Sequence, residues 1–141
     1  MRAYCCNNCV ELYTGHTLAE NAANDIHRIV DNLKNVKIYK YSEVAKRFNI
    51  KSYDFEHYIA PSEYGCTIYD PKKGRWLLFY NETKSEESIR FTLAHELGHI
   101  ILKHTNDNEF NEREANCFAR NILYRLPIND FYSLIDYIRN M

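Results

Sequence analysis

The feature that most constrains this chain is a pair of histidines, His95 and His99, with a glutamate, Glu96, directly after the first. They form the pattern His-Glu-x-x-His inside an apolar run over residues 89–102. In an α-helix each residue turns by about 100°, so His95 and His99 lie only about 40° apart on one face. Two imidazoles on one face can bind one metal ion, and zinc hydrolases use this spacing. The pattern therefore predicts a zinc site with Glu96 as general base.

The residues around the motif indicate that its helix is buried on most sides. The polar residues from Ser88 to Lys103 share one arc about 100° wide on a helical wheel, and this arc contains the whole motif. The remaining arc is almost entirely apolar, so one polar stripe is left to line a cleft. The alternative is that the two histidines are ordinary polar residues on a helix face, without a metal.

Length and charge limit the classes of protein to consider. A chain of 141 residues is one domain's worth, so we expect a single domain over residues 1–141 with a flexible segment at residues 1–16. The net charge is −1 and no run of lysine and arginine exceeds two residues, which argues against direct nucleic-acid binding. The sequence has neither an apolar signal region nor a membrane-spanning run, so we expect a cytoplasmic protein without membrane attachment.

The cysteines leave a second metal site open. The chain has five cysteines, and Cys6 and Cys9 form a Cys-x-x-Cys half-site with Cys5 and His16 nearby. A structural zinc site needs four ligands in tetrahedral geometry, and this set is loose. In a reducing compartment free thiols are the expected state.

The hydrophobic spacing predicts helices at both ends of the chain and a β-hairpin in the middle. The helices begin at polar caps, Thr17, Ser42 and either Thr83 or Ser85, and Pro127 ends one of them. The hairpin turns at Asp70–Gly74, where glycine supplies a positive φ. The predicted ranges are helix 18–34, an extended piece 36–41, helix 43–48, hairpin 64–81, the motif helix 86–104, helix 111–125 and an amphipathic segment 131–138.

A catalytic zinc usually takes three protein ligands, so a further donor is needed downstream. In the three-histidine pattern of metzincins, a glycine and a histidine would stand at positions that are Leu102 and Thr105 here, so this scheme fails. His104 lies about 180° from His95 on the wheel, against the apolar side, and is predicted to pack outside the site.

A glutamate from the following helix is the other source, with Glu109, Glu112 and Glu114 as candidates. Glu112 lies about 50° from the centre of that helix's apolar face and Glu114 about 110° away, so Glu112 is predicted to point inward and Glu114 outward. The alternative partner for Glu112 is Arg90. Asn116, one turn after Glu112, is predicted to hydrogen-bond a ligand histidine.

The stretch Arg90–His99, followed by Glu112–Ala119 and then Pro127, resembles the ImmA/IrrE metallopeptidase family. The resemblance implies a small α+β zincin-like domain with a short antiparallel sheet. Carried over by position, it implies His95, His99 and Glu112 as zinc ligands and Glu96 as the base. It also implies a cytoplasmic bacterial or mobile-element protein whose relatives cleave, or otherwise inactivate, a helix-turn-helix repressor.

Two functions follow from these features. The first is a zinc endopeptidase that cuts a specific protein, a transcriptional repressor of a phage or mobile element, with the edge of the hairpin accepting the substrate as an added strand. In the second, the zinc-containing protein disables its partner by binding alone. The hairpin would then simply cover one face of the motif helix.

Overall fold

The fold was obtained as a computed structural model, which describes residues 15–47, 62–106 and 108–140. Cys5, Cys6 and Cys9, and with them the predicted second metal site, lie outside the described residues. Gly15 and His16, assigned above to a flexible segment, begin a helix. The elements in chain order are α2 (Gly15–Asn24), α3 (Ile26–Asn32), β1 (Val36–Lys40), α4 (Tyr41–Arg47), β2 (Gly65–Asp70), β3 (Arg75–Tyr80), α6 (Glu86–Ile101), α7 (Glu109–Arg125) and α8 (Ile128–Arg139).

The described strands form a three-stranded sheet with β3 at its centre, in the order β1-β3-β2. β2 and β3 are the predicted antiparallel hairpin, and Gly74 in its turn has a φ of 59°. The extended piece predicted after the first helix is β1, which pairs with β3 in parallel. The sheet is therefore mixed rather than antiparallel throughout, because β2 leads the chain back along the sheet and β3 then runs in the same direction as β1. β2 is an edge strand.

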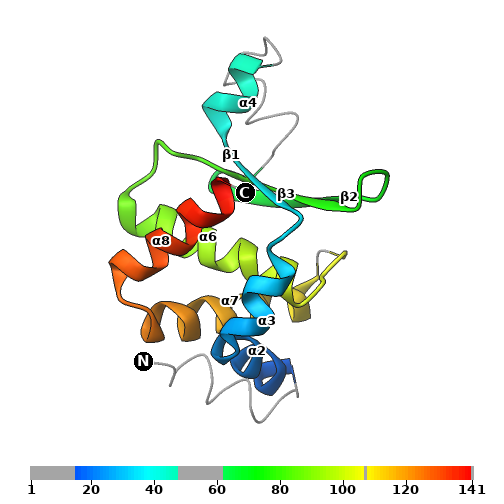
Figure 1. The fold of residues 1–141 in the computed structure, drawn as a ribbon, viewed down its shortest axis with the longest axis vertical. Coiled ribbons are helices and arrows are strands. Elements are labelled where there is room, and N and C mark those ends of the chain that lie inside the picture. Colours follow the sequence, from blue (N-terminus) through cyan, green and yellow to red (C-terminus); the bar gives the residue numbers. More distant parts are fainter. Residues whose placement is uncertain (1–14, 48–61, 107, 141) are drawn as a thin grey trace.

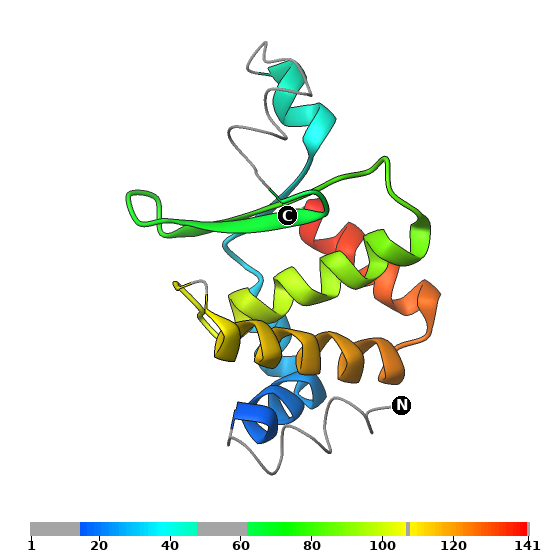
Figure 2. The same ribbon diagram turned by 180° about the vertical axis from the view of Figure 1, so that it is seen from behind.

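The elements lie in layers. Figures 1 and 2 show the sheet over α6, α6 over α7, and α7 over α2, with the hairpin turn projecting beyond the helices. α6 thus contacts the sheet on one side and α7 on the other. Its buried side chains, among them Leu93, Leu97 and Ile100, form the middle of the main core. The α+β class and the buried motif helix are confirmed.

Gly98 allows α6 and α7 to pack closely together. A Cβ atom added at Gly98 would lie 3.0 Å from the ring of Phe118 on α7, so the glycine permits a close approach of the two helices.

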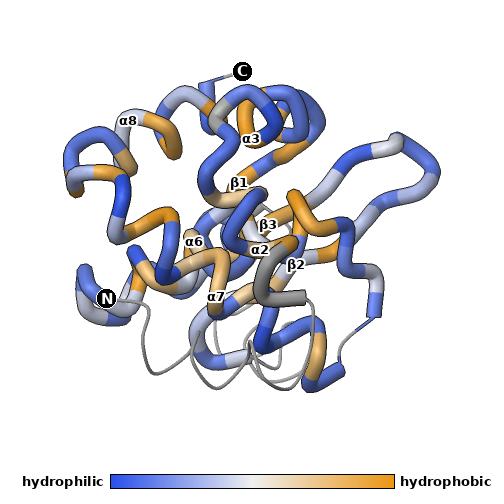
Figure 3. Tube along the Cα trace, turned by 90° about the horizontal axis from the view of Figure 1, so that it is seen from below, coloured by the Kyte–Doolittle hydropathy of each residue, from blue (hydrophilic) through white to orange (hydrophobic). Residues whose placement is uncertain are grey.

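The amphipathic segment predicted near the C-terminus is α8, along which hydrophobic and hydrophilic residues alternate (Figure 3). It buries Phe131, Ile135 and Ile138 in the main core.

The helix ends differ in part from the predicted ones. The helix predicted for residues 18–34 is divided at Asp25, whose side chain accepts a hydrogen bond from the amide of Arg28 and so starts α3. Thr17 lies inside α2 and is not its cap. α6 does begin after Ser85, one of the two predicted caps. It stops at Ile101, three residues before the predicted end.

Ser42, predicted to cap the helix after β1, lies inside α4, which begins one residue earlier at Tyr41. The predicted end of that helix, residue 48, lies outside the described residues. Among the helices that the structure describes, none is both long and apolar enough to span a membrane.

Candidate metal centre

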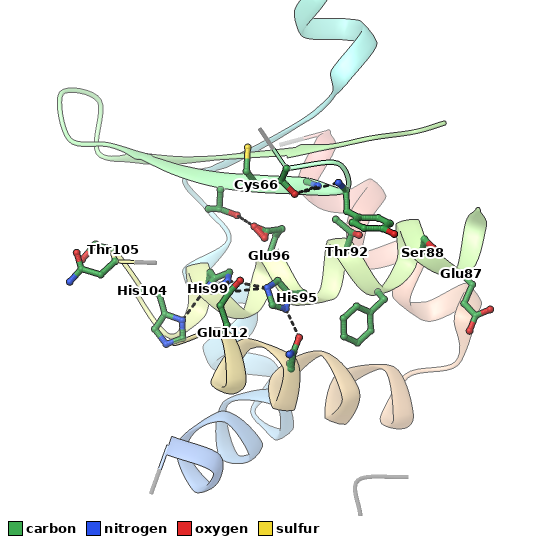
Figure 4. Close-up of a pocket in the computed structure, with 17 residues that line it drawn as sticks. Cys66, Glu87, Ser88, Thr92, His95, Glu96, His99, His104, Thr105 and Glu112 are labelled. Carbon is green, nitrogen blue, oxygen red and sulfur yellow. Dashed lines mark hydrogen bonds and ion pairs between the residues drawn. The ribbon is translucent and has the colours of Figure 1, made fainter. Parts of the chain in front are cut away.

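The two motif histidines project from α6 toward α7, whereas Glu96 projects toward the sheet (Figure 4). The Nε2 atoms of His95 and His99 are 3.1 Å apart, and the ring centroids are 4.7 Å apart. One turn of helix therefore places both imidazoles at one point, as the spacing predicts.

Glu112, in the first turn of α7, completes the group. Its Oε2 atom lies 2.6 Å from Nε2 of His99 and 3.3 Å from Nε2 of His95. Among the described residues, these three make up the one cluster of histidine, cysteine and acidic side chains with ligand atoms within 4.8 Å of one another. The structure thus brings together all three predicted ligands. Glu112 faces the imidazoles rather than Arg90, its alternative partner.

The donor atoms fit a metal cation. Oε2 of Glu112 is buried and accepts no hydrogen bond, although the side chain as a whole is 43% exposed. Burial and the neighbouring His95 lower the pKa of His99 to about 3, so its imidazole is neutral at neutral pH and has a lone pair to donate. When both imidazoles carry their proton on Nδ1, the two Nε2 atoms and Oε2 of Glu112 are three converging electron-pair donors. One ion with bonds of about 2.0–2.2 Å, as zinc forms to nitrogen and oxygen, would contact all three.

Asn116 holds the outer nitrogen of His95, as predicted from its position one turn after Glu112. Its Oδ1 atom lies 2.8 Å from Nδ1 of His95. When Nδ1 carries the proton and donates it to this oxygen, Nε2 keeps its lone pair for a metal.

Two predictions about neighbouring side chains were wrong. His104 was placed against the apolar side, yet its Nδ1 lies 2.9 Å from Nδ1 of His99. The wheel fails there because α6 ends at Ile101 and Lys103 adopts a φ of 58°, which turns His104 back toward the site. Glu114 was predicted to point outward, yet it is only 5% exposed and its Oε1 lies 3.1 Å from Nε2 of His104.

Glu114 escaped prediction because α7 is buried on two sides. The helix packs on α6 along one side and on α2 along another, so a single apolar direction does not describe it. Burial raises the pKa of Glu114 and lowers that of His104. The sequence indicates this pair only by the presence of His104 after the motif helix and of Glu114 two positions after Glu112.

Glu96 lies between α6 and β2. Its side chain is mostly buried, and the Thr67 hydroxyl on β2 donates a hydrogen bond to its Oε1 over 3.1 Å. β2 can approach α6 so closely because residue 65 is glycine: an added Cβ would lie 2.6 Å from the Thr92 side chain. Sequence reasoning did not identify Thr67. The alternation of a strand could have found it, since Gly65 and Thr67 face the same side.

Cys66 also borders this region, from β2. Burial and the nearby Glu96 carboxylate raise the pKa of its thiol to about 12. A thiol with such a pKa stays protonated at neutral pH, so Cys66 is not an activated nucleophile.

These side chains border a cleft of about 870 Å³, which runs between β2 on one side and α6 and the start of α7 on the other. His95, His99, Glu112 and Glu96 line it (Figure 4). Thr67 of β2 lines it as well. The described lining contains glutamates but no lysine or arginine. The Glu96 carboxylate and the imidazoles of His95 and His99 thus border the same cleft.

The sequence model of a peptidase family, described as the IrrE N-terminal-like domain, matches residues 44–134. The chain belongs to this family. The match spans the hairpin, the motif helix and α7, and therefore every residue of the metal centre. No curated protein and no solved structure matches the chain.

Proposed function

We propose that this member of the IrrE N-terminal-like family is a zinc-dependent endopeptidase that hydrolyses one peptide bond in a specific protein. The observation that carries the proposal is the convergence of Glu112 Oε2 on the two Nε2 atoms of the motif histidines, with no hydrogen bond to satisfy that oxygen. A buried carboxylate oxygen without a hydrogen bond is costly, and a cation bound to that oxygen would offset the cost.

His95, His99 and Glu112 would hold the zinc ion. Two histidines and one carboxylate are the ligand set of a well-known class of catalytic zinc sites, which leave one position open for water or substrate. When bound, the ion polarises the scissile carbonyl and lowers the pKa of the attacking water. Asn116, through its contact with Nδ1 of His95, would keep Nε2 of that imidazole turned toward the other donor atoms.

Glu96 is the general base in this proposal. The helix places its carboxylate beside the imidazoles but on the sheet side, so it faces the cleft rather than the ligand cluster (Figure 4). There it takes a proton from the attacking water and passes it to the leaving amine. The hydrogen bond from Thr67 fixes one carboxylate oxygen. The rotation of the carboxylate is thereby restricted before substrate binds.

β2 is a suitable guide for the substrate. Among the strands that the structure describes it lies at the edge of the sheet, and it lines the cleft, so an extended peptide could pair with its outer side. Such pairing would hold the peptide backbone across Glu96, since Thr67 on the same strand contacts that carboxylate.

The proposed substrate is a helix-turn-helix transcriptional repressor of a phage or mobile element, met in the cytoplasm. This choice rests on the resemblance to ImmA/IrrE proteins and on membership of the IrrE N-terminal-like family. The alternative is a protein that contains zinc but disables its partner by binding alone. The cleft between β2 and α6, with a buried glutamate beside the ligands, favours hydrolysis.

Timed incubation with helix-turn-helix repressors from the same genome, beginning with any encoded beside this gene, tests the proposal. The zinc-loaded protein should yield two repressor fragments, and a chelator should stop their formation. Glu96→Gln should keep the zinc and form no fragments, because the amide cannot accept the proton. Fragments from Glu96→Gln at the wild-type rate would refute the mechanism. A stable complex without fragments from either protein would support the binding module instead.

A further inference from the structure

α6 ends in a turn that brings a third histidine to the metal centre. The helix stops at Ile101, and Lys103 takes a left-handed conformation with a φ of 58°. The amide of His104 then donates to the carbonyl of His99 over 2.8 Å. This contact returns the His104 ring to the His99 ring, with centroids 5.2 Å apart at 69°.

A buried chain of hydrogen bonds leads outward from His99. Nδ1 of His99 lies 2.9 Å from Nδ1 of His104, and Nε2 of His104 lies 3.1 Å from Oε1 of Glu114. The side chains of His104 and Glu114 are only 7% and 6% exposed. Two polar side chains are thus enclosed between the end of α6 and the start of α7, a placement that costs free energy unless their hydrogen bonds are made.

The chain allows one arrangement of protons when His99 binds a metal. A ligand Nε2 must keep its lone pair, so His99 carries its proton on Nδ1 and donates it to Nδ1 of His104. His104 must then carry its own proton on Nε2, and it donates that proton to Glu114. The proton on Nδ1 of His99 therefore sets the direction of both hydrogen bonds, from His99 to His104 and from His104 to Glu114.

We propose that His104 and Glu114 are positioning residues that fix the ring orientation and the tautomer of the ligand His99. The inference rests on the metal site of the proposed function but not on peptide hydrolysis. The other ligand histidine has a simpler arrangement, a single bond to the amide of Asn116. Outer partners of metal-bound histidines typically contribute about 10–100-fold to metal affinity.

Zinc affinity, measured by competition with a chromophoric chelator, tests the inference without any peptidase assay. His104→Phe keeps a ring of similar size and removes the acceptor, so the dissociation constant for zinc should rise about 10–100-fold. Glu114→Gln keeps an oxygen that accepts the His104 proton and should stay within a few-fold of wild type. Glu114→Met, of similar length but without an acceptor, should weaken zinc clearly more than Glu114→Gln does.

A spectroscopic measurement on the unaltered protein covers the case in which a variant fails to fold. Nitrogen-15 histidine spectra of the zinc-loaded protein should show His104 protonated on Nε2 and His99 on Nδ1. The inference is overturned if His104 carries its proton on Nδ1 alone, if folded His104→Phe binds zinc as wild type does, or if the Gln and Met variants of Glu114 are equally weak. Zinc binding that follows the expected order, in a protein that cleaves nothing, would contradict the peptidase proposal alone.

Discussion

Replacement of Glu112 by glutamine should strengthen the metal-free fold and weaken zinc binding in the same protein. The substitution keeps the shape of the side chain and changes the atoms that face the imidazoles. In the structure Oε2 of Glu112 is buried, accepts no hydrogen bond and lies 2.6 and 3.3 Å from the two Nε2 atoms. The amide of glutamine can turn an N–H toward these lone pairs, which the carboxylate cannot.

The size of the first effect follows from this geometry. An unsatisfied buried polar atom costs about 1–3 kcal/mol. The side chain of Glu112 is 43% exposed, so its other oxygen keeps solvent and the lower end of this range applies. We therefore expect Glu112→Gln to raise the free energy of unfolding of the metal-free protein by about 1 kcal/mol. For a domain of this length that is a shift of about 3 °C in Tm.

The second effect has the opposite sign. Zinc at 100 times its dissociation constant stabilises the folded wild type by about 2.7 kcal/mol. If the loss of one ligand weakens zinc binding a hundredfold, the same concentration stabilises the variant by only about 0.4 kcal/mol. Glu112→Gln should therefore be more stable than wild type with chelator and less stable than wild type with zinc.

Urea unfolding of both proteins, with chelator and with zinc, measures both effects. Glu109→Gln is the matched control: it is the same change in the same helical turn, at a side chain that is 79% exposed and pairs with Arg113. It should lose a few tenths of a kcal/mol from the helix dipole and leave zinc stabilisation intact. The reasoning is refuted if Glu112→Gln retains the zinc stabilisation of wild type, or if without metal it is less stable than this control.

Three further predictions concern the core, the base and pH. Gly98→Ala should lower the free energy of unfolding, measured by urea titration, by about 1 kcal/mol, because the close contact with the Phe118 ring outweighs the gain in helix propensity. Equal or higher stability would show that the Phe118 ring can move away without cost. Thr67→Val removes the hydrogen bond to Glu96 and should lower kcat/KM for repressor cleavage about tenfold. Thr67→Ser keeps the hydroxyl and should stay within about twofold of wild type. Equal losses in the two variants would contradict a role for the hydroxyl. With chelator present, the free energy of unfolding should fall as pH drops from about 6.5 toward 3, because His99 takes up a proton at a higher pH in the unfolded chain than in the folded one. His99 should contribute about 1.4 kcal/mol per pH unit to this fall. The contribution should be absent from His99→Asn.

The sequence was sufficient to group the three candidate ligands because each lies inside a regular helix. The spacing of His95 and His99 holds wherever the backbone is helical, and the structure has both inside α6. Glu112 was chosen by its angle on the next helix, and the cleft side of α7 does carry it. Helical periodicity is a local property, so it could be read without the tertiary structure.

The side chains around the candidate ligands and Glu96 are placed by the end of α6 and by the packing of other elements against α6 and α7. His104 lies beyond the end of α6, and one left-handed residue, Lys103, reverses its direction. Glu114 is buried because α7 has two packed sides, which no single wheel direction reveals. Thr67 meets Glu96 only because β2 crosses α6. These contacts depend on a helix end and on packing between elements, and helical spacing alone does not predict either.

The parallel pairing of β1 with β3 escaped prediction for the same reason. The hairpin between β2 and β3 is specified locally by a turn with Gly74 at positive φ. β1 joins the sheet from about 40 residues earlier, aligned from Val36↔Trp76 to Lys40↔Tyr80. Nothing near β1 in the sequence marks its direction, because apolar strands pair in either sense.

The most direct test of the account is anomalous diffraction from zinc-loaded crystals at the zinc absorption edge. One strong peak should lie within about 2.0–2.2 Å of Nε2 of His95, Nε2 of His99 and Oε2 of Glu112. The peak should disappear from crystals of Glu112→Gln that are grown at the same zinc concentration. A wild-type peak bound by other side chains, or zinc-loaded crystals with no peak between α6 and α7, would contradict it.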